Sequence, residues 1–309
     1  MSEQPVIQTR GLTRYFGRKA AVYELDLTVP RGGVFALLGR NGSGKTTTIR
    51  MLLGLLEPTR GEATVLGYPS RELPPEVRAR IGYLTEEHQL YNWMTVQQCR
   101  DFQAPFYPRW NEKVFRGVID HFHLLPSAKV RDLSRGERAG LCLALTLAPD
   151  PELLILDDPA MGLDPVARRS LVESMVYLTR RSDRTILFSS HQLEDVERVS
   201  DYVAILDHSI LRASCSLDTF RASMQQVRLR FTGAPPPLPP IHGLVQAQRT
   251  ENELRLVCVR FDQQAEQTLR ALNPAQMEVE AMALEDAFIS YLGERGEKSF
   301  ILAGAEEQP

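Results

Sequence analysis

The stretch Gly39-Arg40-Asn41-Gly42-Ser43-Gly44-Lys45-Thr46 constrains what this chain can fold into more than any other. It fits the pattern Gly, four residues, Gly-Lys-Ser/Thr, in which a glycine loop joins a strand to a helix. The apolar run at residues 34–38 predicts the buried strand before the loop, and residues 47–56 predict the helix after it. Because all three parts are present, an accidental match by a glycine-rich turn is the weaker interpretation.

A loop of this kind is an anion-binding site. Its backbone N–H groups point inward, and the dipole of the following helix favours negative charge. Lys45 is placed for the β- and γ-phosphates of a nucleotide, and the Thr46 hydroxyl for Mg²⁺. Tyr15 and Phe16 precede the loop, so one of them is a candidate for stacking on a purine base. A core aromatic at a strand end is the equal alternative.

The composition limits the possible partners. The chain has 309 residues, enough for one large domain and a small one. Its net charge of −3 gives no case for a nucleic-acid partner. No apolar stretch approaches the ~20 residues needed to span a bilayer, so a membrane process would require another chain as the membrane partner.

Apolar periodicity divides the chain into three regions. In the first, an inserted helical subdomain is expected at about 88–150, with its aromatic residues mostly in its core and one exposed set contacting a partner. After about Cys215, alternating segments and two helical patterns predict a small α+β domain, followed by a polar tail. The strands expected in the first region are residues 6–12, 21–29, 34–38, 61–67, 81–84, 153–156, 185–190 and 202–206.

Three further motifs accompany the glycine loop. Asp157 and Asp158 directly follow the buried run 153–156, at the strand end where α/β sheets bind ligands. His191 directly follows the run 185–190. Residues 133–137, Leu-Ser-Arg-Gly-Glu, open a helix with a serine in N-cap position.

Together these motifs resemble the ATP-binding cassette of ABC transporters, over residues 4–212. The resemblance implies an α/β fold, a P-loop ATPase cassette with a mixed sheet. Shorter matches, such as Glu86-Glu87 and residues 106–110, resemble bacterial exporter cassettes encoded apart from their membrane subunit. The implied domains are a cassette at 1–215 that contains the helical subdomain, an accessory α+β domain at 216–293 and a tail at 294–309.

The resemblance also implies which residues bind ATP. Phe16, rather than Tyr15, would stack on adenine. Ser134 and Gly136 would reach ATP held by the opposite subunit, and Asp164 would lie in the turn that crosses the dimer seam. The implied ATP-binding residues are Phe16, Gly39, Arg40, Asn41, Gly42, Ser43, Gly44, Lys45, Thr46, Thr47, Ser134, Gly136 and Asp164.

The implied catalytic residues are Lys45, Glu86, Asp158 and His191, and the implied Mg²⁺ ligands are Thr46, Asp157 and Glu86. Three positions depart from the family pattern, because Glu86 replaces Gln, Arg135 replaces Gly and Asp158 replaces the catalytic Glu. Asp is one methylene shorter than Glu, and a general base is typically worth ~10²–10⁴-fold in rate. The alternative for Asp158 is a cap or turn residue that contacts no water.

By this resemblance, the expected function is ATP hydrolysis that powers export by a separate integral membrane permease. A second cassette subunit, with a homodimer expected, would complete each ATP site on the cytoplasmic side of the cell membrane, where the protein would be peripheral. One alternative is a soluble cassette ATPase that acts without a transporter. The other is an ATP-gated regulatory cassette with very slow hydrolysis, which Asp158 suggests.

Overall fold

The computed structural model describes residues 4–180, 184–292 and 302–303. These residues form two compact units. The first unit runs to Ser214 and includes the short strand β16 (Leu302–Ala303), and the second begins at Cys215. Apart from β16, the tail expected at 294–309 lies outside the described residues. None of the described helices is long and apolar enough to cross a membrane.

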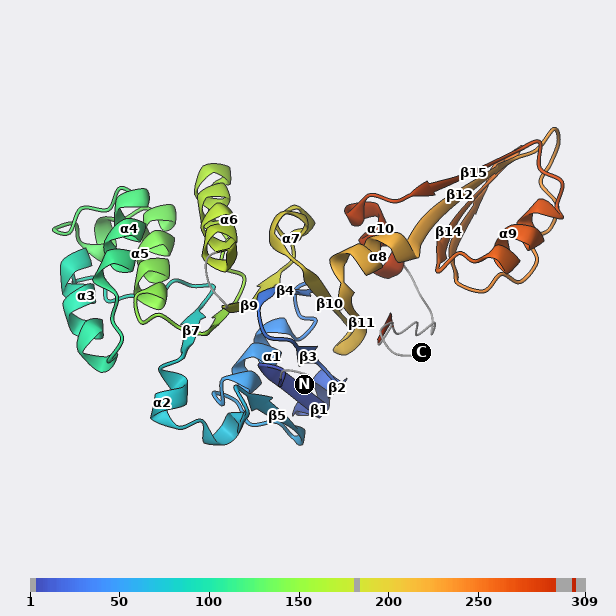
Figure 1. Ribbon diagram of the computed structural model, residues 1–309. Helices are drawn as coiled ribbons and strands as arrows, with labels where there is room; N and C mark the ends of the chain where they lie inside the picture. Colours follow the sequence, from blue (N-terminus) through green and yellow to red (C-terminus); the bar gives the residue numbers. More distant parts are fainter. Residues whose placement is uncertain (1–3, 181–183, 293–301, 304–309) are drawn as a thin grey trace. The chain divides into compact units, whose positions relative to one another are not determined.

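The first unit contains an antiparallel sheet near the N-terminus (Figure 1). The strand expected at 21–29 is in fact two strands, because the first ends at Leu25 and the second begins at Thr28. In spatial order the strands are β2 (Lys19–Leu25), β1 (Ile7–Phe16), β5 (Arg60–Val65) and β6 (Tyr68–Pro69), with β3 (Thr28–Val29) beside β1.

A second sheet of the first unit carries the phosphate loop. Its central strands are almost continuously apolar because both faces are buried. β4, β9, β8 and β7 are parallel neighbours, and Leu38 lies beside Ser190 while Leu156 lies beside Phe188. The described order is β16, β11 (Ile210–Ser216), β10 (Tyr202–Asp207), β4 (Gly33–Leu38), β9 (Thr185–Ser190), β8 (Leu153–Leu156) and β7 (Ile81–Leu84).

This register places the ends of β4, β8 and β9 at one edge of the sheet. The phosphate loop, the two aspartates and His191 follow those ends, so segments more than 100 residues apart meet there. The expected α/β fold with antiparallel and parallel strands is therefore confirmed.

The helices of the first unit connect these strands. α1 ends four residues before the predicted end at residue 56, because Gly54 turns the chain with φ of 68°. The helix α7, which follows His191, was not expected from the sequence. The helices outside the helical subdomain are α1 (Lys45–Leu52), η1 (Ser70–Glu72), α2 (Pro75–Arg78), α6 (Pro165–Arg180) and α7 (Leu193–Val199).

The helices between β7 and β8 form a subdomain with its own core (Figure 1). Trp110, Phe115 and Phe122 pack in that core, whereas four other aromatic side chains are exposed. The aromatic residues are therefore divided between core and surface rather than mostly buried. The helices are α3 (Val96–Gln103), η2 (Ala104–Phe106), α4 (Glu112–His121), η3 (Val130–Asp132) and α5 (Arg135–Leu147).

The second unit is an antiparallel sheet with helices, in the order β13, β14, β12, β15. Leu269 of α9 packs with the apolar side chains of β12 and β14. The proline-rich segment 234–240 lies outside the sheet, as expected. The elements are α8 (Leu217–Ser223), β12 (Met224–Arg230), β13 (Leu244–Arg249), β14 (Glu253–Val259), α9 (Gln263–Arg270), β15 (Gln276–Ala281) and α10 (Leu284–Leu292).

Candidate functional site

An open cleft of about 390 Å³ lies at the phosphate loop. Its size is within the range of small-molecule sites, roughly 300–1,000 Å³. The cleft gathers residues from the antiparallel sheet, the loop and the segments after β7 and β8. Its lining residues are Phe16, Lys19, Ala21, Asn41, Gly42, Gly44, Lys45, Thr46, Thr47, Glu86, Asp158 and Met161.

The phosphate loop requires glycine at two positions. Gly44 has φ of 108°, and a Cβ there would lie 2.3 Å from the carbonyl oxygen of Ala21. A Cβ on Gly39 would lie 2.3 Å from Ser43 Oγ. That Ser43 hydroxyl is buried and has no hydrogen-bond partner among the described residues, although Gly39 and Ser43 themselves do not line the cleft. An unpaired donor beside a glycine loop at a helix N-terminus fits a phosphate oxygen.

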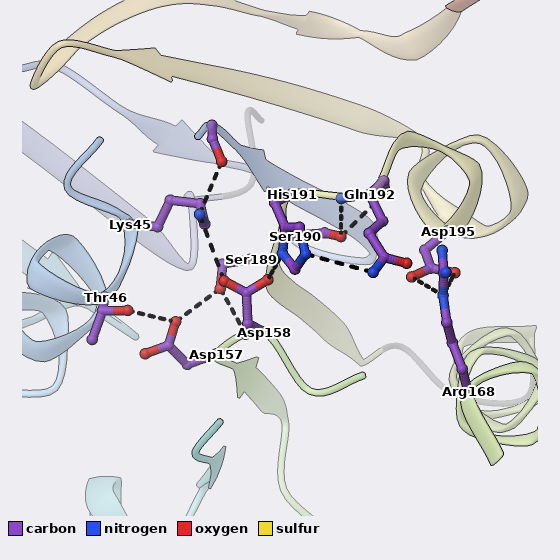
Figure 2. A network of polar contacts seen from close by, with 11 residues as sticks. Lys45, Thr46, Asp157, Asp158, Arg168, Ser189, Ser190, His191, Gln192 and Asp195 are labelled. Atoms are coloured by element: carbon purple, nitrogen blue, oxygen red, sulfur yellow. Dashed lines mark hydrogen bonds and ion pairs between the residues drawn. The ribbon is translucent and has the colours of Figure 1, made fainter. Parts of the chain in front are cut away.

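Lys45 lines the cleft, and its side chain points toward Asp158 (Figure 2). Its side chain is only 5% exposed, and Nζ donates a hydrogen bond to the carbonyl oxygen of Gly39 at 2.9 Å. Nζ also lies 3.6 Å from Asp158 Oδ2. A buried ammonium requires such a partner, since an unpaired buried charge is costly.

Asp157 accepts two hydrogen bonds on the same oxygen, Oδ1. Thr46 Oγ1 donates one at 3.1 Å, and Ser189 Oγ donates the other at 2.8 Å. Burial raises the pKa of Asp157, while the bonds from Ser189 and Thr46 lower it. No group of three or more metal-binding His, Cys, Asp or Glu side chains occurs in the described residues. One carboxylate and one hydroxyl still fit Mg²⁺, which usually takes its other ligands from phosphates and waters.

Asp158 connects Lys45 with His191 (Figure 2). Its backbone is left-handed, with φ of 41°, and its N–H donates to Ser189 Oγ at 2.8 Å. Nδ1 of His191 lies 3.0 Å from Asp158 Oδ1. Gln192 Nε2 lies 3.5 Å from His191 Nε2, which fits an imidazole that carries its proton on Nδ1.

Glu86 and Phe16 lie on the walls of the cleft. Burial raises the pKa of Glu86, and the negative charges of Asp158 and Asp157 raise it further. The ring of Phe16 is half exposed, and the Arg14 guanidinium lies 4.8 Å from its centroid. A flat, accessible aromatic ring of this kind can stack on a base.

Ser134, Gly136 and Asp164 do not line this cleft. Ser134 caps α5, in a capping box with Glu137. Asp164 Oδ1 accepts hydrogen bonds from backbone N–H groups at the start of α6. A Cβ on Gly136 would lie 3.9 Å from Asp164 Oδ2, so these residues form a separate group at the starts of α5 and α6.

Sequence similarity identifies the family of the chain. The sequence model for "ABC transporter" matches residues 22–161. A bacitracin transport ATP-binding protein of Bacillus licheniformis is 34% identical over 215 residues, which cover 69% of this chain and 70% of that protein. This chain belongs to the ABC transporter family. As a cassette of that family it is an ATPase that binds ATP.

Other members of the ABC transporter family extend the comparison. A Nod factor export ATP-binding protein of Cupriavidus pinatubonensis is 37% identical over 65% of this chain, but the match spans only 63% of that protein. The ABC transporter ATP-binding protein YtrB of Bacillus subtilis is 26% identical over 93% of this chain and 98% of its own length. A solved ATP-binding subunit of an ABC transporter has a TM-score of 0.63 and 29% identity, covering 70% of this chain and 92% of that one.

The sequence did not point to Ser189 or to the wall residues Lys19, Ala21 and Met161. Ser189 lies two residues before His191 on β9, where nothing in its own neighbourhood distinguishes it from Ser190. Only the pairing of β8 with β9 brings it beside Asp157.

Proposed function

We propose that this ATPase powers the export of a substrate by a separate integral membrane permease, from the cytoplasmic face of the membrane, where it is peripheral. The observation that carries the proposal is the network at adjoining strand ends that joins the buried residues Lys45, Asp157 and Asp158 with His191. The names of two relatives, a Nod factor export and a bacitracin transport ATP-binding protein, support a role in transport, and the first of them supports export.

In this proposal each side chain of the network has its own role. Lys45 leaves Asp158 to bind the β- and γ-phosphates, and Thr46 and Asp157 hold Mg²⁺. Mg²⁺, when bound, would neutralise negative charge on the phosphates. Asp158 accepts the proton of the attacking water on a carboxylate oxygen. When ATP binds, the Nδ1–H of His191 turns from Asp158 to donate to the γ-phosphate, and Phe16 stacks on adenine.

A second copy of the chain is the proposed partner at each ATP site. Ser134, Gly136 and Asp164 lie together but away from the cleft of their own chain, which supports a role toward another subunit. The N-terminus of α5 presents backbone N–H groups that suit the phosphates of ATP bound elsewhere.

An aromatic cluster on the helical subdomain is the proposed docking surface for the permease. Its side chains are Tyr91, Trp93, Phe102 and Phe106, with successive ring centroids 5.7–6.0 Å apart. All four are more than half exposed. Tyr91 and Phe102 also line a groove of about 400 Å³. An exposed apolar patch of this kind on a subdomain that already has its own core is typical of a protein-binding surface.

Replacing Trp93 and Phe106 with Ala is expected to abolish copurification of the cassette with its permease from detergent-solubilised membranes. The two rings are 65% and 69% exposed, so the free subunit loses little packing, whereas an aromatic anchor in an interface is worth about 2 kcal/mol or more. Leu125→Ala is the matched control, because Leu125 is a large apolar residue of the same subdomain that is 68% exposed. Unchanged copurification of the double variant, or wild-type protein that never associates with a membrane protein, would contradict the proposal.

Ending the chain after Ser214, which removes the second unit and β16, is expected to preserve ATP binding and to alter dimer stability or the coupling of hydrolysis to transport. None of the residues assigned to the nucleotide lies in that unit, and its core is formed by its own strands and α9. ATP affinity and sedimentation with and without ATP would be measured on the truncated chain. A folded truncation that no longer binds ATP would show that the nucleotide site extends into the second unit.

A further inference from the structure

Ser189 is fully buried on β9 and contacts both aspartates that follow β8 (Figure 2). Its hydroxyl donates to Asp157 Oδ1 at 2.8 Å and accepts from the backbone N–H of Asp158 at 2.8 Å. The Ser189 hydroxyl therefore donates to the side chain of Asp157 and accepts from the backbone of Asp158.

The contact to Asp157 selects which oxygen can face a cation. Both Ser189 and Thr46 donate to Oδ1 of Asp157, so Oδ2 is the oxygen that can bind Mg²⁺ or one of its waters. Thr46 is itself placed to move toward a cation, and its bond to Asp157 can then be lost. Ser189 lies on the neighbouring strand β9 and is buried, so its hydrogen bond to Asp157 can persist when Mg²⁺ and ATP are bound.

The contact to Asp158 fixes a backbone conformation that few residues other than glycine adopt. Asp158 has φ of 41°, and such positions persist only where the surroundings hold them. The N–H of Asp158 is buried and has Ser189 Oγ as its acceptor. Without that hydroxyl the buried N–H loses its partner, and the left-handed backbone that aims the Asp158 carboxylate loses one of its supports.

We propose that Ser189 is a positioning residue, which holds Asp157 toward the divalent cation and Asp158 toward the attacking water. The inference rests on the proposed function, since it assigns Ser189 a role at the same ATP site. Neighbours of metal ligands are known to orient them, and their loss typically costs about 10–100-fold in metal affinity or activity.

The test compares Ser189→Ala with Ser190→Ala in the full chain. Ser190 is the adjacent buried serine of β9, but its hydroxyl bonds with the backbone of Gln192 instead of an aspartate. ATP affinity is measured by equilibrium dialysis with Mg²⁺ and again with EDTA. We expect the gain in affinity from Mg²⁺ to fall about tenfold in Ser189→Ala, to remain in Ser190→Ala and to return in Ser189→Thr, which keeps a hydroxyl.

The ratio of the two affinities separates positioning from a general loss of structure. A merely structural defect would weaken ATP binding equally with Mg²⁺ and with EDTA, and this result would overturn the inference, as would a full Mg²⁺ effect in folded Ser189→Ala. If Ser189→Ala does not fold, Ser189→Cys is used, because sulfur is a weak hydrogen-bonding group of similar placement. If the wild-type protein binds ATP with the same affinity in Mg²⁺ and in EDTA, the proposed function of the site as a Mg²⁺-ATP site is refuted instead.

Discussion

Replacing Lys45 with Ala is expected to weaken ATP binding about 100-fold or more, because hydrogen bonds from a charged group are worth about 1.5–3 kcal/mol each and about 1.4 kcal/mol is tenfold in affinity. The Lys45 ammonium is the buried cation of the cleft, and it is already aimed at an anionic partner, Asp158. A phosphate would take the place of that carboxylate. Turnover should fall to background because bound ATP would no longer be held in line with the water.

Lys19→Ala is the matched control for this substitution. Lys19 lines the same cleft, but its side chain is exposed, so its loss should change affinity only by a small screened charge effect. Removing Lys45 also leaves Asp158 buried without its cation, so folding must be checked by thermal unfolding, with Lys45→Met as a variant of similar volume. ATP affinity and turnover equal to the wild type in folded Lys45→Ala would show that the loop is not the site.

Asp158→Asn is expected to leave ATP binding at least as tight as in the wild type and to lower single-turnover hydrolysis about 10²-fold or more. Asn keeps an acceptor for His191 Nδ1 and tolerates positive φ, but it cannot accept a proton. It also removes the negative charge that competes with phosphate for Lys45. ATP should therefore hold two copies of the variant in a long-lived dimer, visible by size-exclusion chromatography.

Glu87→Gln is the control, since Glu87 is an exposed carboxylate near the cleft that touches neither Lys45 nor Asp158. Asp158→Glu tests whether the length of the side chain at position 158 limits hydrolysis. Its additional methylene must fit a side-chain site that is only 8% exposed, at a backbone angle less suited to Glu than to Asp, so slower hydrolysis is expected. Wild-type hydrolysis by Asp158→Asn would remove Asp158 from the mechanism and make Glu86 the candidate base.

The parts of this structure that the sequence predicted are those with a local physical signal. The runs 34–38, 153–156 and 185–190 are strands buried on both faces, and such strands are recognisable because nearly every residue is apolar. Ser134 was predicted as a helix cap from its position before Glu137, and the capping box confirms it.

What the sequence did not predict depends on neighbours distant in the chain or on weak local patterns. β13 and β15 lie at the edges of their sheet and most of their residues are exposed, so the short apolar alternation of β15 (Met277, Val279, Ala281) was not recognised as a strand. The role inferred for Ser189 requires knowing that β8 and β9 are adjacent. The positive φ of Asp158 was likewise not predicted, although Asp adopts such angles more readily than most residues and its N–H is bonded to Ser189.

Inserting or deleting a single residue within β8 or β9 would change which side chains meet at the site, although every proposed catalytic residue would still be present in the sequence. Side chains along a strand alternate between its two faces, so a shift by one residue in β9 would present Ser190 where Ser189 now meets Asp157. His191, which directly follows β9, would also shift by one position and lose its contact with Asp158. A change of one residue in the length of either strand should therefore disrupt the site, whereas a change of length in a loop or in the second unit leaves this register intact.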